Sequence, residues 1–261
     1  MNLYLAGSTP ISGSDLYTNV KSRLFSYVEK PNIKKIEAES RSTYKNLMID
    51  SGAFSVWSKG KVIRVEDYAD FIIHSSNTFK SIKNVYYVNL DVIGDEYKTK
   101  KNLEYLENKR GLEVLPVFTY KASFKELERL MESYKYVLFG GLVPLDNKQL
   151  FKWLDPCFSI IMNYYKKTGK LLKVHLLGIT RIEFVNRYPI FSCDSTTWFN
   201  VIRFGVVTKG IGVRKKMPRV AESESAKTAN VYVIKKEINR FMRREQEVTN
   251  LWKYRGIEFD E

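Results

Sequence analysis

The sequence predicts an α/β fold, and within that class a (β/α)8 TIM-like barrel with a C-terminal helical extension. Short apolar, β-branched or aromatic runs recur along the 261 residues, and several are almost continuously apolar, as parallel strands covered on both faces are. Segments with helical spacing separate these runs. An open doubly wound sheet would suit six strands better, and no Gly-x-Gly-x-x-Gly turn follows the first run. The alternation therefore favours a barrel.

Eight runs are expected to form the barrel strands. In chain order they are NLYLAG (2–7), NLMID (46–50), NVYYVNLD (84–91), LEVLPVFTY (112–120), YVLFGGL (136–142), KVHLLGI (173–179), IFSCD (190–194) and VIRFGVV (201–207).

Three segments between these runs have the spacing of helices. Apolar residues stand at every fourth position within residues 15–29. A Ser-x-x-Glu capping signal begins residues 123–134, and residues 148–165 supply a further helix.

The C-terminal part of the chain has a different character. Residues 230–252 are expected to form one amphipathic helix, with Lys and Arg pairs opposite its apolar face. The preceding residues 209–219, KGIGVRKKMPR, are interpreted as a basic loop. We therefore divide the chain into a barrel at 1–208 and, at 209–261, a basic loop and a helix packed on the barrel.

Composition indicates a soluble intracellular protein with an anionic partner. The net charge is +14, from 43 Lys and Arg against 29 Asp and Glu, which favours nucleic acid first and an anionic membrane second. The alternative is a solvated basic surface. Two cysteines argue for a reducing compartment, and no CxxC pair or His-rich stretch predicts a metal site. The first residues do not resemble a signal peptide, and no apolar run reaches the roughly 18 residues that span a bilayer.

Acids and glycines stand where several expected strands end. Asp50 ends the second strand, Asp91 the third and Asp194 the seventh, while Gly140 and Gly141 end the fifth. In a barrel these ends share one mouth, where chemistry collects. A single aspartate at a strand end is more often a turn former or a helix cap. Three on one rim indicate a shared site.

Five segments in this region, taken in order, resemble the tRNA-guanine transglycosylases. MIDSGAFS (48–55) resembles their Asp-Ser-Gly-Gly-Phe/Tyr segment, and NLDVIGD (89–95) resembles their base-reading strand end. FGGLVP (139–144) is similar to their Gly-Gly-Leu loop and KVHLLGI to their His-x-Leu-x-Gly-Val strand. CDSTTW (193–198) resembles the nucleophile segment of archaeal members. The resemblance extends from residue 48 to residue 198.

Two departures indicate which branch of this superfamily the chain resembles. The family's zinc site, a Cys-x-Cys-x-x-Cys with a later His, does not follow residue 198, and PVFTY (116–120) stands where the tRNA enzymes use a glutamine. A short zinc-free chain is most similar to the phage and bacterial DpdA-type DNA transglycosylases. These exchange guanine in DNA for a 7-deazaguanine and need no cofactor for the exchange.

The resemblance implies roles for individual residues. Asp194 would be the nucleophile at C1′ of the sugar, and Asp50 the general acid/base that protonates the leaving guanine. Asp91 would accept hydrogen bonds from N1–H and the 2-amino group of the base. The remaining expected substrate contacts are Ser51, Gly52, Phe54, Gly140, Gly141, Leu177 and Gly178. Phe54 and Leu177 would sandwich the ring, although a lone aromatic is more often part of the core.

The expected partners are DNA and a free 7-deazaguanine base such as preQ0, with tRNA as the alternative substrate. The expected phosphate contacts, with a solvated loop as the alternative, are Lys209, Arg214, Lys215, Lys216 and Arg219. RFMRRE (240–245) is a weaker candidate. His175 is interpreted as an interior histidine and Cys193 as a small buried residue.

Two further functions stay open at this point. One is a hydrolase in which water resolves the Asp194 intermediate. The other is a non-catalytic nucleic-acid-binding barrel, which predicts that the rim acids are not clustered. The oligomeric state is open.

Overall fold

The computed structural model describes residues 1–7, 17, 19–41, 43–199, 206–209, 213–216 and 224–259. For residue 199, the ranges 206–209 and 213–216, and residues 224–230 it describes the backbone alone.

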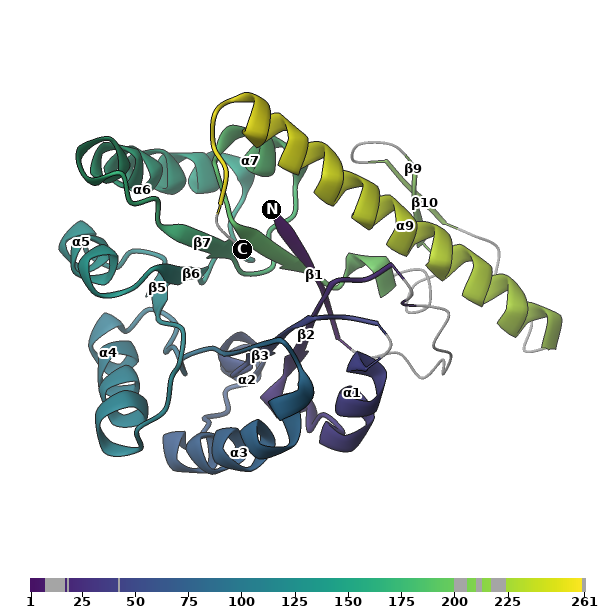
Figure 1. Ribbon diagram of the computed structural model, residues 1–261, viewed down its shortest axis with the longest axis horizontal. Coiled ribbons are helices and arrows are strands. Elements are labelled where there is room, and N and C mark those ends of the chain that lie inside the picture. Colours follow the sequence, from purple (N-terminus) through teal and green to yellow (C-terminus); the bar gives the residue numbers. More distant parts are fainter. Residues whose placement is uncertain are drawn as a thin grey trace.

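Eight parallel strands form one curled sheet, which confirms the predicted TIM-like (β/α)8 architecture (Figure 1). The strand order is β4-β3-β2-β1-β8-β7-β6-β5, so strands that are adjacent in this order are also consecutive in sequence, except for β1 and β8. The strands are β1 (Asn2–Ala6), β2 (Ser22–Ser26), β3 (Asn46–Asp50), β4 (Asn84–Tyr87), β5 (Val117–Thr119), β6 (Tyr136–Gly140), β7 (Lys173–Leu176) and β8 (Ser192–Ser195).

A short seam joins the two strands at the ends of this order, β4 and β5. Val88 and Leu115 form a parallel bridge just beyond β4 and just before β5. Leu115 N–H donates to Tyr87 O at 2.7 Å, and Asn89 N–H donates to Leu115 O at 2.8 Å. The sheet therefore curls round until its two ends meet.

Helices follow most strands and cover the outside of the sheet. They are α1 (Ile33–Ser40), α2 (Ala53–Trp57), α3 (Val65–Thr78), α4 (Glu96–Glu104), α5 (Phe124–Ser133), α6 (Asn147–Thr168), α7 (Ile182–Arg187) and α9 (Glu224–Tyr254). The predicted capping signal before α5 is confirmed, because Ser123 Oγ accepts from Glu126 N–H. Asp146 and Gln149 form a capping box at the start of α6.

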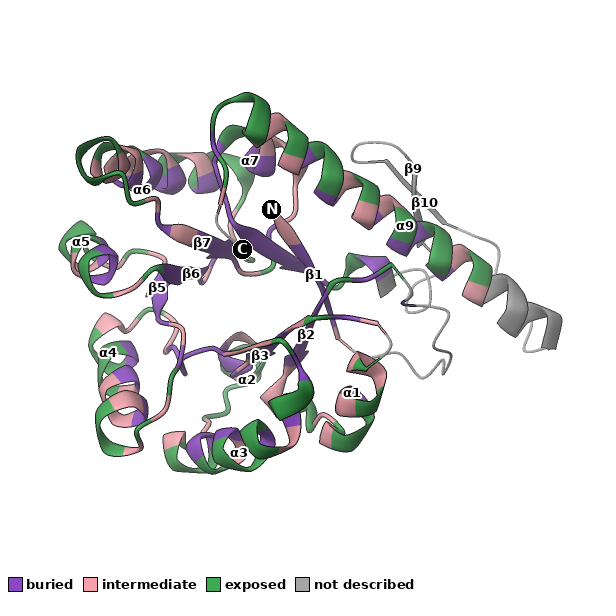
Figure 2. Cartoon of the chain, in the orientation of Figure 1, coloured by how far each residue is buried: buried purple, intermediate pink, exposed green. Residues whose placement is uncertain are grey.

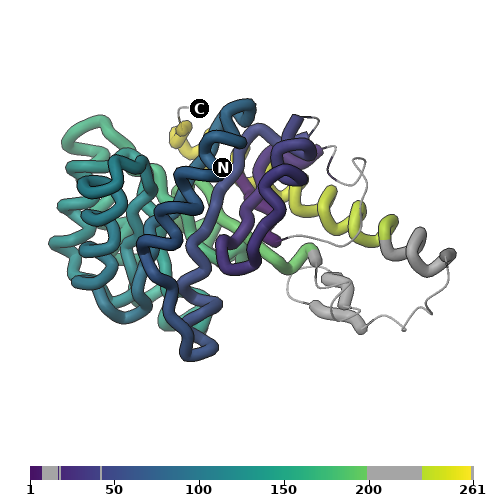
Figure 3. The backbone as a smooth tube through the Cα atoms, turned by 90° about the horizontal axis from the view of Figure 1, so that it is seen from below, coloured from purple at the N-terminus to yellow at the C-terminus, as the bar shows by residue number. Residues whose placement is uncertain are grey.

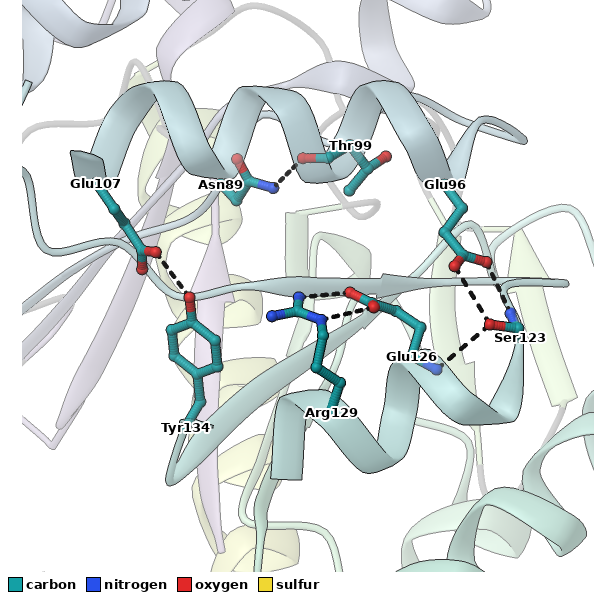
Figure 4. Close-up of polar contacts among 8 residues, drawn as sticks. All are labelled: Asn89, Glu96, Thr99, Glu107, Ser123, Glu126, Arg129 and Tyr134. Carbon is teal, nitrogen blue, oxygen red and sulfur yellow. Dashed lines mark hydrogen bonds and ion pairs between the residues drawn. The ribbon is translucent and has the colours of Figure 1, made fainter. Parts of the chain in front are cut away.

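Polar contacts between α4 and α5 reinforce the seam (Figure 4). At one end, the Glu96 carboxylate accepts hydrogen bonds from Ser123 N–H at 2.8 Å and from Ser123 Oγ at 3.2 Å. At the other end, Tyr134 OH donates to Glu107 at 2.7 Å, from just beyond α5 to the helical turn that extends α4. Both helices are thus linked across the seam, where Val88 and Leu115 form an isolated bridge.

Buried residues lie along the strands and on parts of the surrounding helices (Figure 2), and they form clusters on both faces of the sheet. Within β1, Tyr4 and Ala6 belong to the cluster inside the barrel, whereas Leu3 and Leu5 belong to the cluster between sheet and helices. This alternation is the period of two that a strand imposes. The predicted C-terminal helix is confirmed as α9, which crosses the outside of β1 and α7 (Figure 1). The residues of α9 in the outer cluster are Ile234, Ile238, Phe241 and Val248.

The two ends of the barrel carry different parts of the chain (Figure 3). The C-terminus lies at the end where strands begin, and Phe259 packs there on Phe191 with ring centroids 5.3 Å apart. The segment that links β3 to α3, blue in the tube, reaches the opposite end. That opposite end is the mouth, onto which the carboxyl ends of the strands open.

One strand was missed in the sequence. Residues 22–26, predicted to lie within a helix, form β2, with Leu24 inside the barrel and Phe25 in an outer cluster. Arg23 interrupts the apolar run, yet it is 1% exposed and its guanidinium lies 4.1 Å from the Tyr17 ring centroid. Charged residues are usually exposed, so the buried Arg23 made this strand difficult to recognise in the sequence.

The prediction of a barrel strand at residues 201–207 was wrong. Residues 206–209 form β9 (Val206–Lys209), which pairs antiparallel with β10 (Val213–Lys216) in a separate two-stranded sheet. Residues 201–205 lie outside the described residues. The strands expected as second, third, fifth and seventh are therefore β3, β4, β6 and β8. Part of the expected basic loop 209–219 is strand, because β10 falls within it.

Candidate active site

Three aspartates come to the mouth from strands β3, β4 and β8. Asp50 is the last residue of β3, Asp91 lies beyond the end of β4, and Asp194 lies within β8 rather than at its end. After burial, the negative charges of Asp91 and Asp194 raise the pKa of Asp50, so both residues lie near enough to affect it. The structure thus brings the three aspartates to the same end of the barrel, as expected from the strand ends.

Asp50 and Asp91 lie in a poorly solvated part of the mouth. Burial, followed by the charges of Asp91 and Asp194, raises the pKa of Asp50 to about 7. The Gly52 N–H, 2.9 Å from Asp50 Oδ2, acts in the opposite direction. Burial raises the pKa of Asp91 to about 7, and this residue is 6% exposed. A general acid/base works best with a pKa near the working pH, and the raised pKa of Asp50 suits that role.

Asp194 has different surroundings. Its Oδ1 accepts a hydrogen bond from Gly178 N–H at 2.7 Å and lies 3.2 Å from His175 Nε2. Gly178 has φ +72°, and a Cβ at this position would stand 2.6 Å from Val143 Cγ2. Only glycine therefore fits the turn that brings this N–H to the carboxylate. The Gly178 N–H and the His175 ring nitrogen both meet Oδ1, so together they fix the orientation of the Asp194 side chain.

Behind Asp194 lies a chain of buried polar side chains. His175 Nδ1 is 2.7 Å from Ser192 Oγ, and Ser192 Oγ is 2.6 Å from Tyr136 OH. His175 and Ser192 are fully buried, and the Tyr4 ring packs against the imidazole with centroids 5.6 Å apart. His175 is interior, as expected, but its contact with Asp194 was missed. The sequence did contain a signal for this contact, because residues two apart on a strand share a face. His175 shares a face with Leu177, and Ser192 shares a face with Asp194 on the adjacent strand.

Gly140 brings other predicted contact residues together. A Cβ at Gly140 would lie 3.3 Å from Asp91 Oδ2 and 3.6 Å from Leu177 Cδ1. Asp91, which is expected to read the base, and Leu177, which is expected to stack on it, thus come together beside Gly140. Gly141, with φ +74°, would crowd Tyr120 if it carried a Cβ, at 3.3 Å. Neighbouring side chains therefore pack directly against the backbone at both glycines, and a larger residue would be crowded at either position.

The turn after Asp50 combines structural and exposed groups. Ser51 is fully buried and its Oγ accepts from Ala53 N–H at 3.4 Å, a local bond within the turn. At Gly52, with φ +81°, a Cβ would lie 2.4 Å from Val28 Cγ2, so the turn needs glycine. The half-buried Phe54 pairs with Trp57, whose exposed fraction is 51%. Trp57 was not among the predicted site residues, although its position three residues after Phe54 places both rings on one face of α2.

Four of the five predicted phosphate contacts lie on the two-stranded sheet of β9 and β10. Lys209 ends β9, and Arg214, Lys215 and Lys216 belong to β10, where the backbone alone is described. Arg219 lies outside the described residues.

The RFMRRE segment of α9 has structural contacts. Glu245 is buried and accepts from Leu3 N–H at 2.8 Å, while the half-buried Arg244 lies 3.5 Å from Thr180 O. These two residues fix α9 to the barrel.

The described residues contain no group of three or more His, Cys, Asp or Glu side chains with the geometry of a metal site. Cys157 and Cys193 are buried free thiols, and burial raises the pKa of both. Among the described helices, none is long and apolar enough to cross a membrane.

A scan against protein-family models finds no match to the chain, and a search of curated proteins finds no significant match. The interpretation of the site therefore depends on its residues and their geometry.

Proposed function

We propose that the chain is a DNA guanine transglycosylase, which exchanges guanine for a 7-deazaguanine base through a covalent aspartyl-glycosyl intermediate. The observation that carries this proposal is that the aspartates at one mouth of the barrel have different surroundings. Asp194 Oδ1 accepts from Gly178 N–H and lies 3.2 Å from His175 Nε2, whereas the pKa of Asp50 is raised to about 7 by burial and by its acidic neighbours. A nucleophile attacks as a carboxylate and a general acid needs a proton, so different surroundings suit the two roles.

The reaction has two balanced halves. In the first, Asp194 forms a bond to C1′ of the deoxyribose while the bond from C1′ to N9 of guanine breaks, and protonated Asp50 gives its proton to the leaving base. In the second, N9 of the entering 7-deazaguanine attacks C1′ and releases Asp194. The proton from that N9 goes to the Asp50 carboxylate, which restores the starting state.

Asp91, Gly140 and Leu177 form the proposed base-binding part of the site. An ionised Asp91 accepts hydrogen bonds from the N1–H and 2-amino donors of guanine, and 7-deazaguanine carries the same two donors. These donors compensate the burial of the carboxylate, so base binding is expected to lower the pKa of Asp91. Phe54 is proposed to cover one face of the ring.

The nucleic-acid partner follows from the chemistry and the charge. A stacked base does not reach a barrel mouth, so the enzyme takes single-stranded substrate or flips the base out, at a cost of about a few kcal/mol. Contacts between phosphates and a protein of net charge +14 offset that cost. The zinc-free sequence favours DNA over tRNA. A non-catalytic binding barrel, which predicts unclustered acids, fits the coupled Asp50, Asp91 and Asp194 less well.

An exchange assay with labelled guanine tests the proposal. DNA and tRNA, each with guanine labelled, are incubated separately with the protein and free preQ0. Label is expected to leave DNA when preQ0 is present and to stay in tRNA. Release from tRNA alone would replace DNA with tRNA as the substrate. Release without added base would indicate hydrolysis, and no release from either would contradict the proposed reaction.

A further inference from the structure

The buried chain Tyr136–Ser192–His175 has no part in the two half-reactions proposed above. We infer that this chain positions Asp194, by occupying Oδ1 and leaving Oδ2 as the oxygen that attacks the sugar. The chemical role of Oδ2 rests on the proposed function, whereas the hydrogen-bond arrangement itself does not.

The direction of the hydrogen bonds follows from Asp194 Oδ1, which already accepts from Gly178 N–H at 2.7 Å and so acts as a carboxylate oxygen without a proton. A carboxylate has no proton to give, so His175 Nε2, 3.2 Å from Asp194 Oδ1, carries the hydrogen. In a neutral imidazole Nδ1 is then an acceptor, and Ser192 Oγ at 2.7 Å donates to it. Ser192 has only one proton, so Tyr136 OH at 2.6 Å donates to Ser192. Every member of the chain has one consistent orientation.

The two oxygens of Asp194 are thereby distinguished. In the described part of the chain, Oδ1 receives hydrogen bonds from both His175 and Gly178, and no hydrogen bond is made to Oδ2. Gly178 N–H is fixed by a backbone turn that only glycine fits. Backbone on one side and imidazole on the other therefore prevent rotation of the carboxylate. A fixed nucleophile is what an in-line attack on C1′ needs.

Burial makes the arrangement a rigid one. His175 and Ser192 are 0% exposed and Tyr136 is 7% exposed, so the chain lies beneath the mouth and touches substrate only through Asp194. Tyr136 is packed between the rings of Tyr86 and Phe191, with centroids at 5.5 Å and 5.1 Å. A fully satisfied buried network of this kind fixes its members' rotamers. These residues are accordingly positioning residues rather than catalytic ones.

The imidazole tautomer gives a test that does not depend on activity. The sequence has two histidines, His74 on the exposed side of α3 and His175, so 15N-labelled histidine gives a two-ring spectrum. The H74Q variant assigns the signals. At pH 7 we expect the His175 ring to be the neutral Nε2–H tautomer, and S192A to convert it into a mixture. A protonated Nδ1 in the wild-type protein, alone or together with Nε2, would overturn the inferred chain.

Exchange kinetics test the positioning role. Misplacement of a reacting group by about 1 Å lowers a rate by about 100-fold, so H175L is expected to lower kcat by that factor with KM little changed. H175Q retains an N–H donor near the Nε2 position and is expected to recover much of the loss. S192A and Y136F, which leave His175 in place, are expected to lower kcat less, and together by no more than the larger single effect.

The outcomes separate the inference from the proposed function. If wild-type protein exchanges bases and H175L, S192A and Y136F all keep its kcat, the positioning role is wrong and the function stands. If no nucleic acid is a substrate, the proposed function fails, while the tautomer still decides the chain. H74Q, at an exposed position of α3, is the activity control. If H175L does not fold, as judged by its thermal unfolding, S192A and Y136F carry the kinetic test.

Discussion

On the β7–β8 side of the mouth, Asp194 receives two hydrogen bonds on one oxygen, and a buried imidazole and a backbone turn hold it in place. On the β3–β4 side, Asp50 receives one backbone hydrogen bond, and burial raises the pKa of both Asp50 and Asp91 to about 7. The residue type is the same on both sides. The surroundings of each carboxyl group, rather than the residue type, therefore distinguish the proposed nucleophile from the proposed general acid/base.

The comparison predicts its largest effect at Asp194. D194N keeps the shape of the side chain and removes the anion, so the exchange rate is expected to fall by a factor on the order of 10^4 or more. Single-turnover release of labelled guanine measures it. The exposed Asp70, paired with Arg110 on the helical layer, supplies the control D70N, which is expected to keep wild-type activity. If D194N kept most of the rate, the two sides would have to exchange roles.

The next effect is expected at Asp50, as a change in the pH profile. Its protonated form donates to the leaving guanine, and its pKa is about 7, so guanine release is expected to decline as the pH rises through about 7. D50N has no proton to give, and it is expected to release guanine about 10^2- to 10^4-fold more slowly, with the decline gone. Single-turnover rates between pH 5 and 9 give both quantities. A wild-type decline that persists in D50N would assign the ionisation to another group.

Both sides of this comparison were foreseeable in outline because strand ends in a parallel barrel share a mouth whichever strands they belong to. The missed β2 and the misassigned 201–207 therefore left the convergence of Asp50, Asp91 and Asp194 intact. Those errors arose because apolar spacing does not identify the sheet that a run joins, and because the buried Arg23 breaks the apolar pattern of β2.

The environments of the acids were not foreseeable. The contact of His175 with Asp194 depends on the register of β7 against β8, where His175 pairs with Ser192, and on the rotamers of both side chains. The raised pKa values of Asp50 and Asp91 depend on how completely neighbouring elements exclude water. Both properties belong to packing between distant segments, which a single sequence does not specify.

The Asp194 side is expected to be sensitive to Gly178. G178A places a Cβ 2.6 Å from Val143 Cγ2 at a position with φ +72°, which displaces the N–H that holds Oδ1. We expect kcat to fall roughly 10- to 100-fold. Gly169, with φ +71° and no neighbouring atom within 4 Å of the place a Cβ would take, provides the matched control G169A. It carries the same backbone strain, about 1–3 kcal/mol of stability, without the steric contact. Equal kcat values for the two variants would show that Gly178 serves the turn and not the nucleophile.

The smallest expected effect is on stability, at Asp91. Its pKa is about 7 in the folded protein and about 3.9 in an unfolded chain, so the folded state binds the proton more tightly. The stability that this proton provides is complete below about pH 4 and is lost as the pH rises to about 7. D91N has no such ionisation. It is therefore expected to be more stable than wild type at pH 8, by about 1–3 kcal/mol, and to lose that advantage toward pH 4.

Urea unfolding of wild type and D91N at pH 4.5 and pH 8 measures this difference, with the exposed D70N as the control that is expected to show no comparable trend. If D91N were less stable than wild type at pH 8, the Asp91 carboxylate would be ionised and stabilised in the folded protein. Asp91 would then resemble Asp194, and the contrast between the two sides of the mouth would reduce to Asp50 alone. Whether D91N is more or less stable than wild type at pH 8 therefore decides whether both Asp50 and Asp91, or Asp50 alone, differ from Asp194.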